Sequence, residues 1–150
     1  MENIDAVIGS LEQITRIFKQ FESQTVEVDG YKLSATQMLF LKIINEEECI
    51  YVGRLAQMMG RSAASLTAIL DRLEERGLAV RDRNKPDRRK VFVRLTETGR
   101  IVVEKLPATS RDDFLMEFSK LDDDKKKQIS LSMQQVIELM QKSLDYRTDD

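Results

Sequence analysis

The sequence predicts a mainly α-helical fold with one small β-hairpin, and three features of the chain predict it. Only two prolines and six glycines interrupt the 150 residues, so long helices can form. Apolar residues recur at spacings of three and four through most of the chain, as in amphipathic helices. Between residues 79 and 95 that spacing changes to the alternation typical of strands. The length suits one domain, residues 1–150, with a buried core.

The N-terminal third predicts two helices and a short strand. Residues 3–24 carry an apolar stripe at helical spacing and are predicted to form one long helix. After the turn-like Asp29-Gly30, Ser34 and Gln37 have the spacing of a capping box, which begins a second helix. That helix is apolar almost all round, so we expect it at the centre of the fold. Residues 49–52 are β-prone and predict a brief strand.

The next segment predicts two helices joined by a tight turn. Gly53 is expected to be the N-cap of a short helix over residues 54–59, and Gly60 makes the turn. Ser62 is expected to cap the following helix, which Gly77 ends in a left-handed conformation. The second helix has an inward face at helical spacing, formed by Leu66, Ile69, Leu70 and Leu73. This order is the helix-turn-helix pattern.

A basic hairpin follows, and further helices end the chain. Residues 79–83 and 90–95 predict two antiparallel strands, with turn residues at 84–87. Helix, turn, helix and basic hairpin together predict a winged helix-turn-helix lobe over residues 34–99. Thr96 should cap another helix, which Pro107 is expected to kink and which continues through Phe118. The last helix begins at Asp122, with acids that complement the helix dipole.

The charge is distributed unevenly along the chain. The net charge is −2, but residues 54–100 hold 12 Lys and Arg against 6 Asp and Glu, a balance of +6. The remaining residues hold 12 against 20, a balance of −8, which returns the total to −2. A basic segment carried by acidic helices suits a partner that is a polyanion, although a solvated basic face would have the same composition.

Each part of the predicted lobe has a role on double-stranded DNA. The second helix of the pair fits the major groove, where its outward residues meet base edges and phosphates. We expect this recognition surface to consist of Arg61, Ser62, Ala64, Ser65, Thr67, Ala68 and Arg72. The hairpin tip is expected to enter the minor groove through the wing residues Arg83, Lys85, Asp87, Arg88, Arg89 and Lys90.

From residue 33 to residue 99 the sequence resembles the MarR (multiple antibiotic resistance regulator) family. The resemblance is carried by three stretches: Leu55-Ala56 with Met59-Gly60, residues 70–78 (LDRLEERGL), and residues 87–99 (DRRKVFVRLTETG). It implies a transcriptional regulator whose terminal helices form a homodimer and which responds to a small-molecule effector. It also implies that Asp87 orients the wing by pairing with a nearby arginine, and that Arg88 or Arg89 enters the minor groove. Members often carry arginine or another polar residue where Ala68 stands, so direct readout here relies more on methyl contacts.

The terminal helices are expected to form the dimer interface. Residues 3–24 and 100–145 carry apolar stripes outside a winged helix that is already nearly complete, so burial against a second copy explains them better than packing within one chain. We therefore predict a ligand-responsive repressor that binds a pseudo-palindromic operator. The residues that bind the effector are not assigned.

Several residues keep two interpretations. Arg72 either contacts phosphate or pairs with neighbouring acids, and the alanine-rich recognition surface also allows a winged helix that binds protein instead of DNA. Cys49 is either a redox sensor or a structural thiol, and the second interpretation is favoured because the oxidant-sensing cysteine of this family lies in the first helix, where residues 1–24 contain none.

Other classes of protein are disfavoured. The chain has no histidine, no glycine-rich phosphate loop and no nucleophile beside a base, so we expect neither an enzyme nor a cofactor or metal site. No apolar run reaches the length of a membrane span, which predicts no membrane partner. The single cysteine and the lack of a basic signal sequence predict a cytoplasmic protein.

Overall fold

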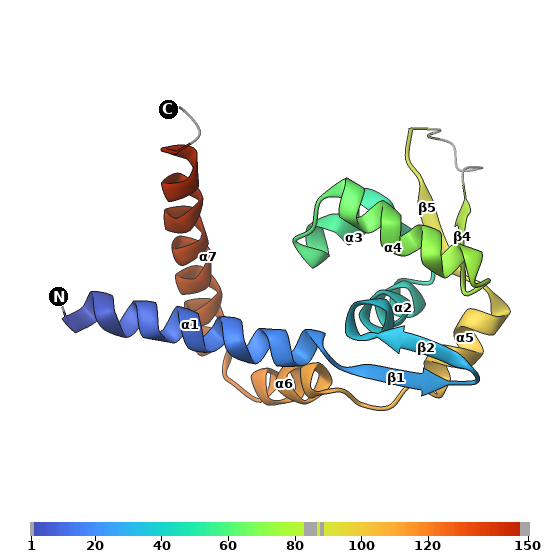
Figure 1. The fold of residues 1–150 in the computed structure, drawn as a ribbon, viewed down its shortest axis with the longest axis horizontal. Coiled ribbons are helices and arrows are strands. Elements are labelled where there is room, and N and C mark those ends of the chain that lie inside the picture. Colours follow the sequence, from blue (N-terminus) through green and yellow to red (C-terminus); the bar gives the residue numbers. More distant parts are fainter. Residues whose placement is uncertain (1, 83–86, 88, 148–150) are drawn as a thin grey trace. The chain divides into compact units, whose positions relative to one another are not determined.

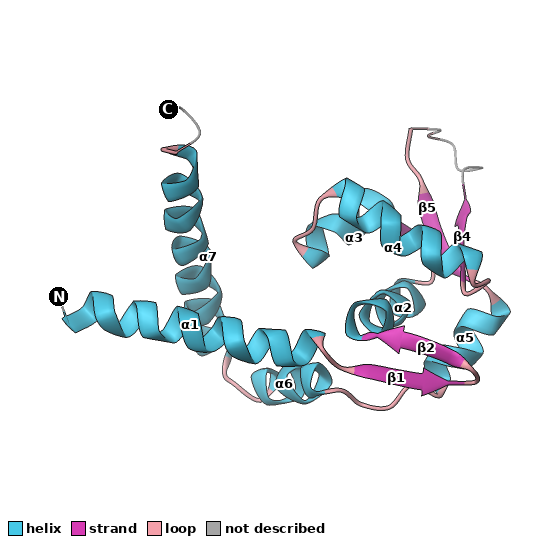
Figure 2. Cartoon of the chain, in the orientation of Figure 1, coloured by secondary structure: helices cyan, strands magenta, loops and turns pink. Residues whose placement is uncertain are grey.

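The computed structural model describes residues 2–82, 87 and 89–147, and it confirms a mainly helical fold with small antiparallel sheets (Figures 1 and 2). The chain divides into two compact units, Met1–Pro107 and Ala108–Asp150. The first unit contains α1 (Glu2–Glu22), β1 (Thr25–Val28), β2 (Tyr31–Ser34), α2 (Ala35–Glu47), β3 (Ile50–Tyr51), α3 (Val52–Met59), α4 (Ala63–Glu75), β4 (Ala79–Asp82), β5 (Phe92–Leu95) and α5 (Glu97–Glu104). The second contains α6 (Ser110–Ser119) and α7 (Asp123–Asp145).

A β-hairpin joins α1 to α2, and the sequence analysis did not predict its strands. β1 and β2 pair antiparallel, with Val26 opposite Leu33. Asp29 and Gly30 form the turn at φ values of +49° and +81°, which suits the two-residue turns that connect tightly twisted strands. The Asp-Gly pair between alternating apolar residues was the available signal for this hairpin.

Helix α2 lies at the centre of the first unit, as predicted. The Ser34 side chain accepts a hydrogen bond from the Gln37 amide at 3.2 Å, and the Gln37 side chain accepts one from the Ser34 amide at 3.0 Å. This capping box satisfies two amides that have no partner within the helix. The apolar face behind it, Met38, Phe40, Leu41 and Ile44, is no more than 1% exposed. Burial of these side chains fixes α2 as the support for the elements around it.

The predicted strand at residues 49–52 is confirmed as β3, but the prediction that Gly53 caps the next helix is wrong. Helix α3 begins at Val52, and its N-cap is Tyr51, which makes no side-chain cap hydrogen bond. A small polar cap is dispensable because the Val52 amide donates to the carbonyl oxygen of Val91 at 2.9 Å. Gly53 instead leaves room for an aromatic ring, since a Cβ atom there would lie 2.5 Å from Cε1 of Tyr51.

Helix α4 and the β4–β5 hairpin follow the predicted pattern. Ser62 caps α4 by accepting a hydrogen bond from the Ser65 amide, and Gly77 ends the helix region at φ +72°. The three-stranded sheet has the order β3-β5-β4, with Ile50 opposite Val93 and Ala79 opposite Leu95. In Figure 1, α4 runs from α3 to the base of β4 and β5. The helix-turn-helix pair and its hairpin thus form one lobe around the buried Leu66, Leu70 and Leu73 of α4.

The prediction of one kinked helix from residue 97 through Phe118 is wrong. Helix α5 ends at Glu104, before Pro107, and α6 begins at Ser110. Proline lacks an amide hydrogen and disfavours helical conformation in the residue before it. Thr109 and Asp112 then form a second capping box, in which the Thr109 amide donates to Oδ2 of Asp112 at 2.6 Å. Within the second unit, α7 begins at the predicted place, with the Asp122 side chain accepting from the Lys125 amide at 2.8 Å.

Candidate nucleic-acid interface

The turn between α3 and α4 fixes the start of the predicted recognition helix. Gly60 ends α3 in the left-handed conformation at φ +59°, where a side chain is disfavoured. Arg61 follows, with one nitrogen of its guanidinium 3.4 Å from Oγ1 of Thr36 and 3.6 Å from a carboxylate oxygen of Glu22. Arg61 therefore ties the turn to α2 and α1, which restricts the positions that its charge can reach on DNA.

Most of the predicted recognition surface is exposed on α4. The exposed members are Ser62, Ala64, Thr67, Ala68 and Arg72, whereas Arg61 and Ser65 are half-buried. The Thr67 hydroxyl donates to the Ala63 carbonyl at 2.9 Å, and the Thr67 side chain is exposed. Methyl groups at residues 64, 67 and 68 match the chemistry of thymine methyl contacts. Of the residues that the structure describes, none forms an ion pair with Arg72, including the acids suggested as its partners.

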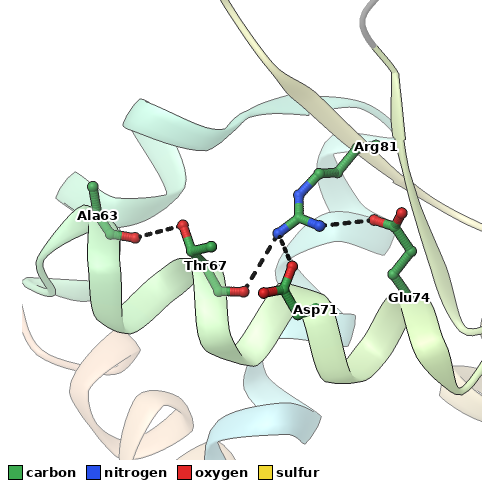
Figure 3. Close-up of polar contacts among 5 residues, drawn as sticks. All are labelled: Ala63, Thr67, Asp71, Glu74 and Arg81. Atoms are coloured by element: carbon green, nitrogen blue, oxygen red, sulfur yellow. Dashed lines mark hydrogen bonds and ion pairs between the residues drawn. The ribbon is translucent and has the colours of Figure 1, made fainter.

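Arg81, and not Arg72, forms ion pairs with two acids of α4, Asp71 and Glu74. Arg81 of β4 lies over one side of α4, and Figure 3 shows its guanidinium between the side chains of Asp71 and Glu74. Nη2 lies 2.7 Å from Oδ1 of Asp71 and Nη1 lies 3.0 Å from Oε2 of Glu74. Nη2 also donates to the carbonyl oxygen of Thr67 at 3.4 Å. The Arg81 side chain is only 19% exposed, so solvent screens these contacts less than it would at an open surface. The cluster fixes the base of the wing against the recognition helix, and the sequence analysis missed it.

The described wing residues form a tight turn whose side chains are exposed. The Asp87 carboxylate accepts a hydrogen bond from the Arg89 amide at 3.0 Å, and the Asp87 carbonyl accepts one from the Lys90 amide at 3.1 Å. Asp87 therefore orders this turn through backbone amides, and its pairing with an arginine side chain stays a prediction. Arg89 and Lys90 are exposed. The predicted wing residues Arg83, Lys85 and Arg88 lie outside the described residues.

Aromatic contacts support the base of the wing on the β3 side. The rings of Tyr51 and Phe92 lie 6.0 Å apart, and Nζ of Lys90 lies 5.2 Å from the centre of the Tyr51 ring. A cation over an aromatic face is attracted by the ring quadrupole, so Tyr51 restrains Lys90. The available signal for this cluster was an aromatic residue directly before the helix-turn-helix, which the sequence analysis treated only as part of a strand.

The cysteine, the potential metal ligands and the long helices were the remaining candidate features. Cys49 is a free, half-buried cysteine between α2 and β3. Among the described residues, no group of three His, Cys, Asp or Glu side chains is placed to hold a metal ion. Along the same part of the chain, no helix combines the length and the apolarity needed to cross a bilayer.

Comparison with known proteins defines the class of this lobe. The model of the MarR family matches residues 33–91, which include α2, the helix-turn-helix and the first part of the wing. The chain is 30% identical over 124 residues to the HTH-type transcriptional regulator SarZ from Staphylococcus haemolyticus, which covers 83% of this chain and 81% of that protein.

Solved structures extend the likeness over most of the chain. The transcriptional regulator BldR from Sulfolobus solfataricus is 26% identical, with a TM-score of 0.64 over 89% of this chain and 96% of BldR. A mutant of MarR from E. coli, complexed with operator DNA, is 25% identical, with a TM-score of 0.56 over 89% of this chain and 93% of MarR.

The lobe is thus a winged helix-turn-helix of the kind found in transcriptional regulators. The chain belongs to the MarR family. It is a transcriptional regulator and not an enzyme, as the sequence predicted.

Proposed function

We propose that the chain is a homodimeric repressor that binds a pseudo-palindromic operator in double-stranded DNA and is released by a small-molecule effector. The DNA-binding part of the proposal rests on the surface of α4, which exposes methyl groups and hydroxyls and is flanked by two arginines that other residues hold in place. Arg61 is anchored at the N-terminal end and Arg81 holds the wing at the side. The E. coli MarR structure with operator DNA supports this proposal.

The two ends of the interface have different roles. The first turns of α4 present Ala64, Thr67 and Ala68 to base edges, whereas the exposed wing residues Arg89 and Lys90 neutralise phosphates. In a dimer, two such helices reach half-sites about 10 bp apart. Because the base-facing groups are mainly methyls, we expect the half-site to be rich in A and T.

Exposed apolar stripes on the terminal helices support dimerisation. On α7 the stripe recurs every three or four residues, and its members are between 40% and 66% exposed: Ile129, Met133, Ile137, Met140 and Leu144. On α1 the exposed members include Ile4, Val7, Ile8, Ile14 and Phe18. Burial of such a side chain from a fully exposed state contributes about 1.5–3 kcal/mol, and about half of each surface here is still exposed, so burial of the whole stripe against a second copy of the chain is favourable.

For an effector to release the protein from DNA, it must bind two arrangements of the dimer with different affinity: one in which the two DNA-binding lobes fit the operator, and one in which they do not. A ligand of equal affinity for both would shift nothing. The residues of the effector site remain unassigned, and repression remains part of the proposal.

DNA binding is tested by fluorescence anisotropy with DNA from upstream of the gene and with a random duplex. The wild type should bind the upstream DNA more tightly, with a steep dependence on salt. Arg89→Ala should flatten that dependence, whereas Arg147→Ala, which removes an exposed arginine at the C-terminal end of α7, should leave it unchanged. If the wild type prefers neither duplex and the Arg89 variant behaves identically, the protein-binding alternative replaces this proposal.

Dimerisation is tested by sedimentation equilibrium. The wild type should have twice the 17.4 kDa mass of one chain. Ile137→Glu places a charge within the α7 stripe and should shift the protein to the monomer. Gln135→Glu adds the same charge about 200° around the helix and should not. A wild-type monomer, or a dimer that the Ile137 variant does not weaken, would contradict the assigned interface.

A further inference from the structure

A basic cleft lies beside α4 on the side away from Arg81. Its volume is about 500 Å³, and its lining includes Lys32 of β2, Ser34 at the start of α2, and Arg72, Glu75 and Arg76 from the C-terminal part of α4. Three of these side chains are cationic and one is anionic, so the lining has a net positive charge. A depression whose lining has a net positive charge suits an anionic group.

The β1–β2 hairpin that forms one wall is held at two points. Nη1 of Arg76 donates to the Lys32 carbonyl at 2.9 Å, and the same guanidinium lies 5.3 Å from the centre of the Tyr31 ring. At the turn, Nζ of Lys105 lies 2.7 Å from Oδ2 of Asp29. The backbone of Lys32 is therefore fixed relative to α4, although its side chain is exposed.

Two of the cations are free to act on a ligand. Arg76 is occupied by the hairpin, but Lys32 and Arg72 are both exposed, and neither forms an ion pair with another residue that the structure describes. An exposed pair of cations from two elements gains little from folding alone, since like charges repel each other. Their placement at one cleft is explained by an external anion.

The position of the cleft identifies the anion. At about 100° per residue, Asp71 and Glu74 lie on the side of α4 that faces the wing, and Arg72 and Arg76 lie on the opposite side. A helix in the major groove has a phosphate backbone along each of its sides. We propose that Lys32 and Arg72 together bind a backbone phosphate of the operator on the side opposite to the wing. This inference rests on the proposed DNA-binding function.

The cleft also contains an acidic residue whose substitution should change DNA affinity in the opposite direction to substitution of the cations. Glu75 lies in the lining with the cations, and its carboxylate would repel the phosphate. Glu75→Gln should therefore tighten DNA binding, whereas Lys32→Ala and Arg72→Ala should weaken it. This pattern distinguishes a phosphate site from a cleft that serves only the stability of the hairpin.

The experiment measures anisotropy of full-length protein on a duplex selected by the wild type from a random pool. One phosphate lost per protomer should reduce the slope of log affinity against log salt by about 2 in the dimer complex. Lys127→Ala, an exposed lysine of α7, is the control for loss of charge. Duplexes with single neutral methylphosphonate linkages should then reveal one position per half-site that weakens the wild type and has no further effect on Lys32→Ala.

Each outcome decides between the explanations. If the wild type selects no duplex, the proposed function and this inference both fail. If the wild type binds but the Lys32 and Arg72 variants keep its salt slope, only this inference fails. In that second case, the melting temperature in inorganic phosphate gives a further decision. If phosphate raises the melting temperature of the wild type and not of the Lys32 and Arg72 variants, the cleft binds a free small anion and the DNA-phosphate assignment is overturned.

Discussion

Replacing Gly99 by alanine tests a close approach between two backbone segments in the DNA-binding lobe. A Cβ atom at Gly99 would lie 2.0 Å from the carbonyl oxygen of Leu78 and 3.0 Å from its carbon. That oxygen is not free to move, because it accepts a hydrogen bond from the Thr96 amide at 3.1 Å. The Thr96 hydroxyl, in turn, donates to the Gly77 carbonyl at 2.6 Å. Relief of the clash therefore requires that α5 move away from the segment that joins α4 to β4.

The magnitude follows from three contributions. Overpacking costs about 1–3 kcal/mol. Weakening one or two of the hydrogen bonds that hold Thr96 costs about 1 kcal/mol each. Alanine in a helix is favoured over glycine by about 1 kcal/mol, which offsets part of this. The expected net loss is about 1–4 kcal/mol, or a fall of about 2–16 °C in melting temperature for a chain of this size.

Urea denaturation followed by circular dichroism measures this loss. Gly9→Ala in α1 is the matched control, because no atom apart from the neighbouring backbone of its own helix lies within 4 Å of the added methyl group. That variant should be as stable as the wild type or more stable by up to about 1 kcal/mol. If Gly99→Ala has the unfolding midpoint of the wild type, the inferred contact between α5 and Leu78 is wrong.

Three further substitutions test the interface and its support. Arg81→Ala leaves two carboxylates on α4 without their cation, so it should lower the free energy of unfolding by about 1–3 kcal/mol in urea denaturation and weaken DNA binding in anisotropy. The control Arg94→Ala removes an exposed arginine of β5 and should change the free energy of unfolding by less than about 0.5 kcal/mol. Equal losses in the two variants would show that the Arg81 cluster has no special role. Ser62→Ala removes the α4 cap and should cost about 1 kcal/mol by the same denaturation assay, and a loss near zero would mean that water satisfies the Ser65 amide. Leu66→Ala leaves a cavity under α4 and should cost about 2–5 kcal/mol, so a thermal melt unchanged from the wild type would contradict its burial.

Local patterns predicted much of the lobe because they act within a few residues. The capping box at Ser34 and Gln37, the cap at Ser62 and the left-handed Gly77 each depend on neighbours in sequence, and each is confirmed. The apolar spacing of α4 likewise placed Leu66 and Leu70 in the core. Such features are set by backbone geometry and burial, which the residue order specifies directly.

Contacts between distant residues could not be predicted in the same way. The sequence left Arg72 either to contact phosphate or to pair with the acids beside it, but Asp71 and Glu74 pair with Arg81, after the chain has turned back through Gly77. The start of α3 at Val52 depends on the Val91 carbonyl, which lies just before β5, far along the chain. In both cases the partner is chosen by the tertiary fold, so residue type and local spacing leave several candidates equally good.

The acidic half of α4 shows why these long-range contacts matter for function. Asp71, Glu74 and Glu75 lie in the last turns of a helix that is proposed to enter a groove lined with phosphates, where each carboxylate would be repelled. The wing supplies Arg81 to the first two acids. The β1–β2 hairpin supplies Lys32 beside the third, together with Arg72 and Arg76 of α4. A cationic element therefore covers each side of the acidic half, and the exposed methyls of its first turns are left to approach the bases. If this account is correct, adding Lys32→Ala to Arg81→Ala should weaken DNA binding by the sum of the two separate effects, because the two cations lie on opposite sides of α4 and share no partner.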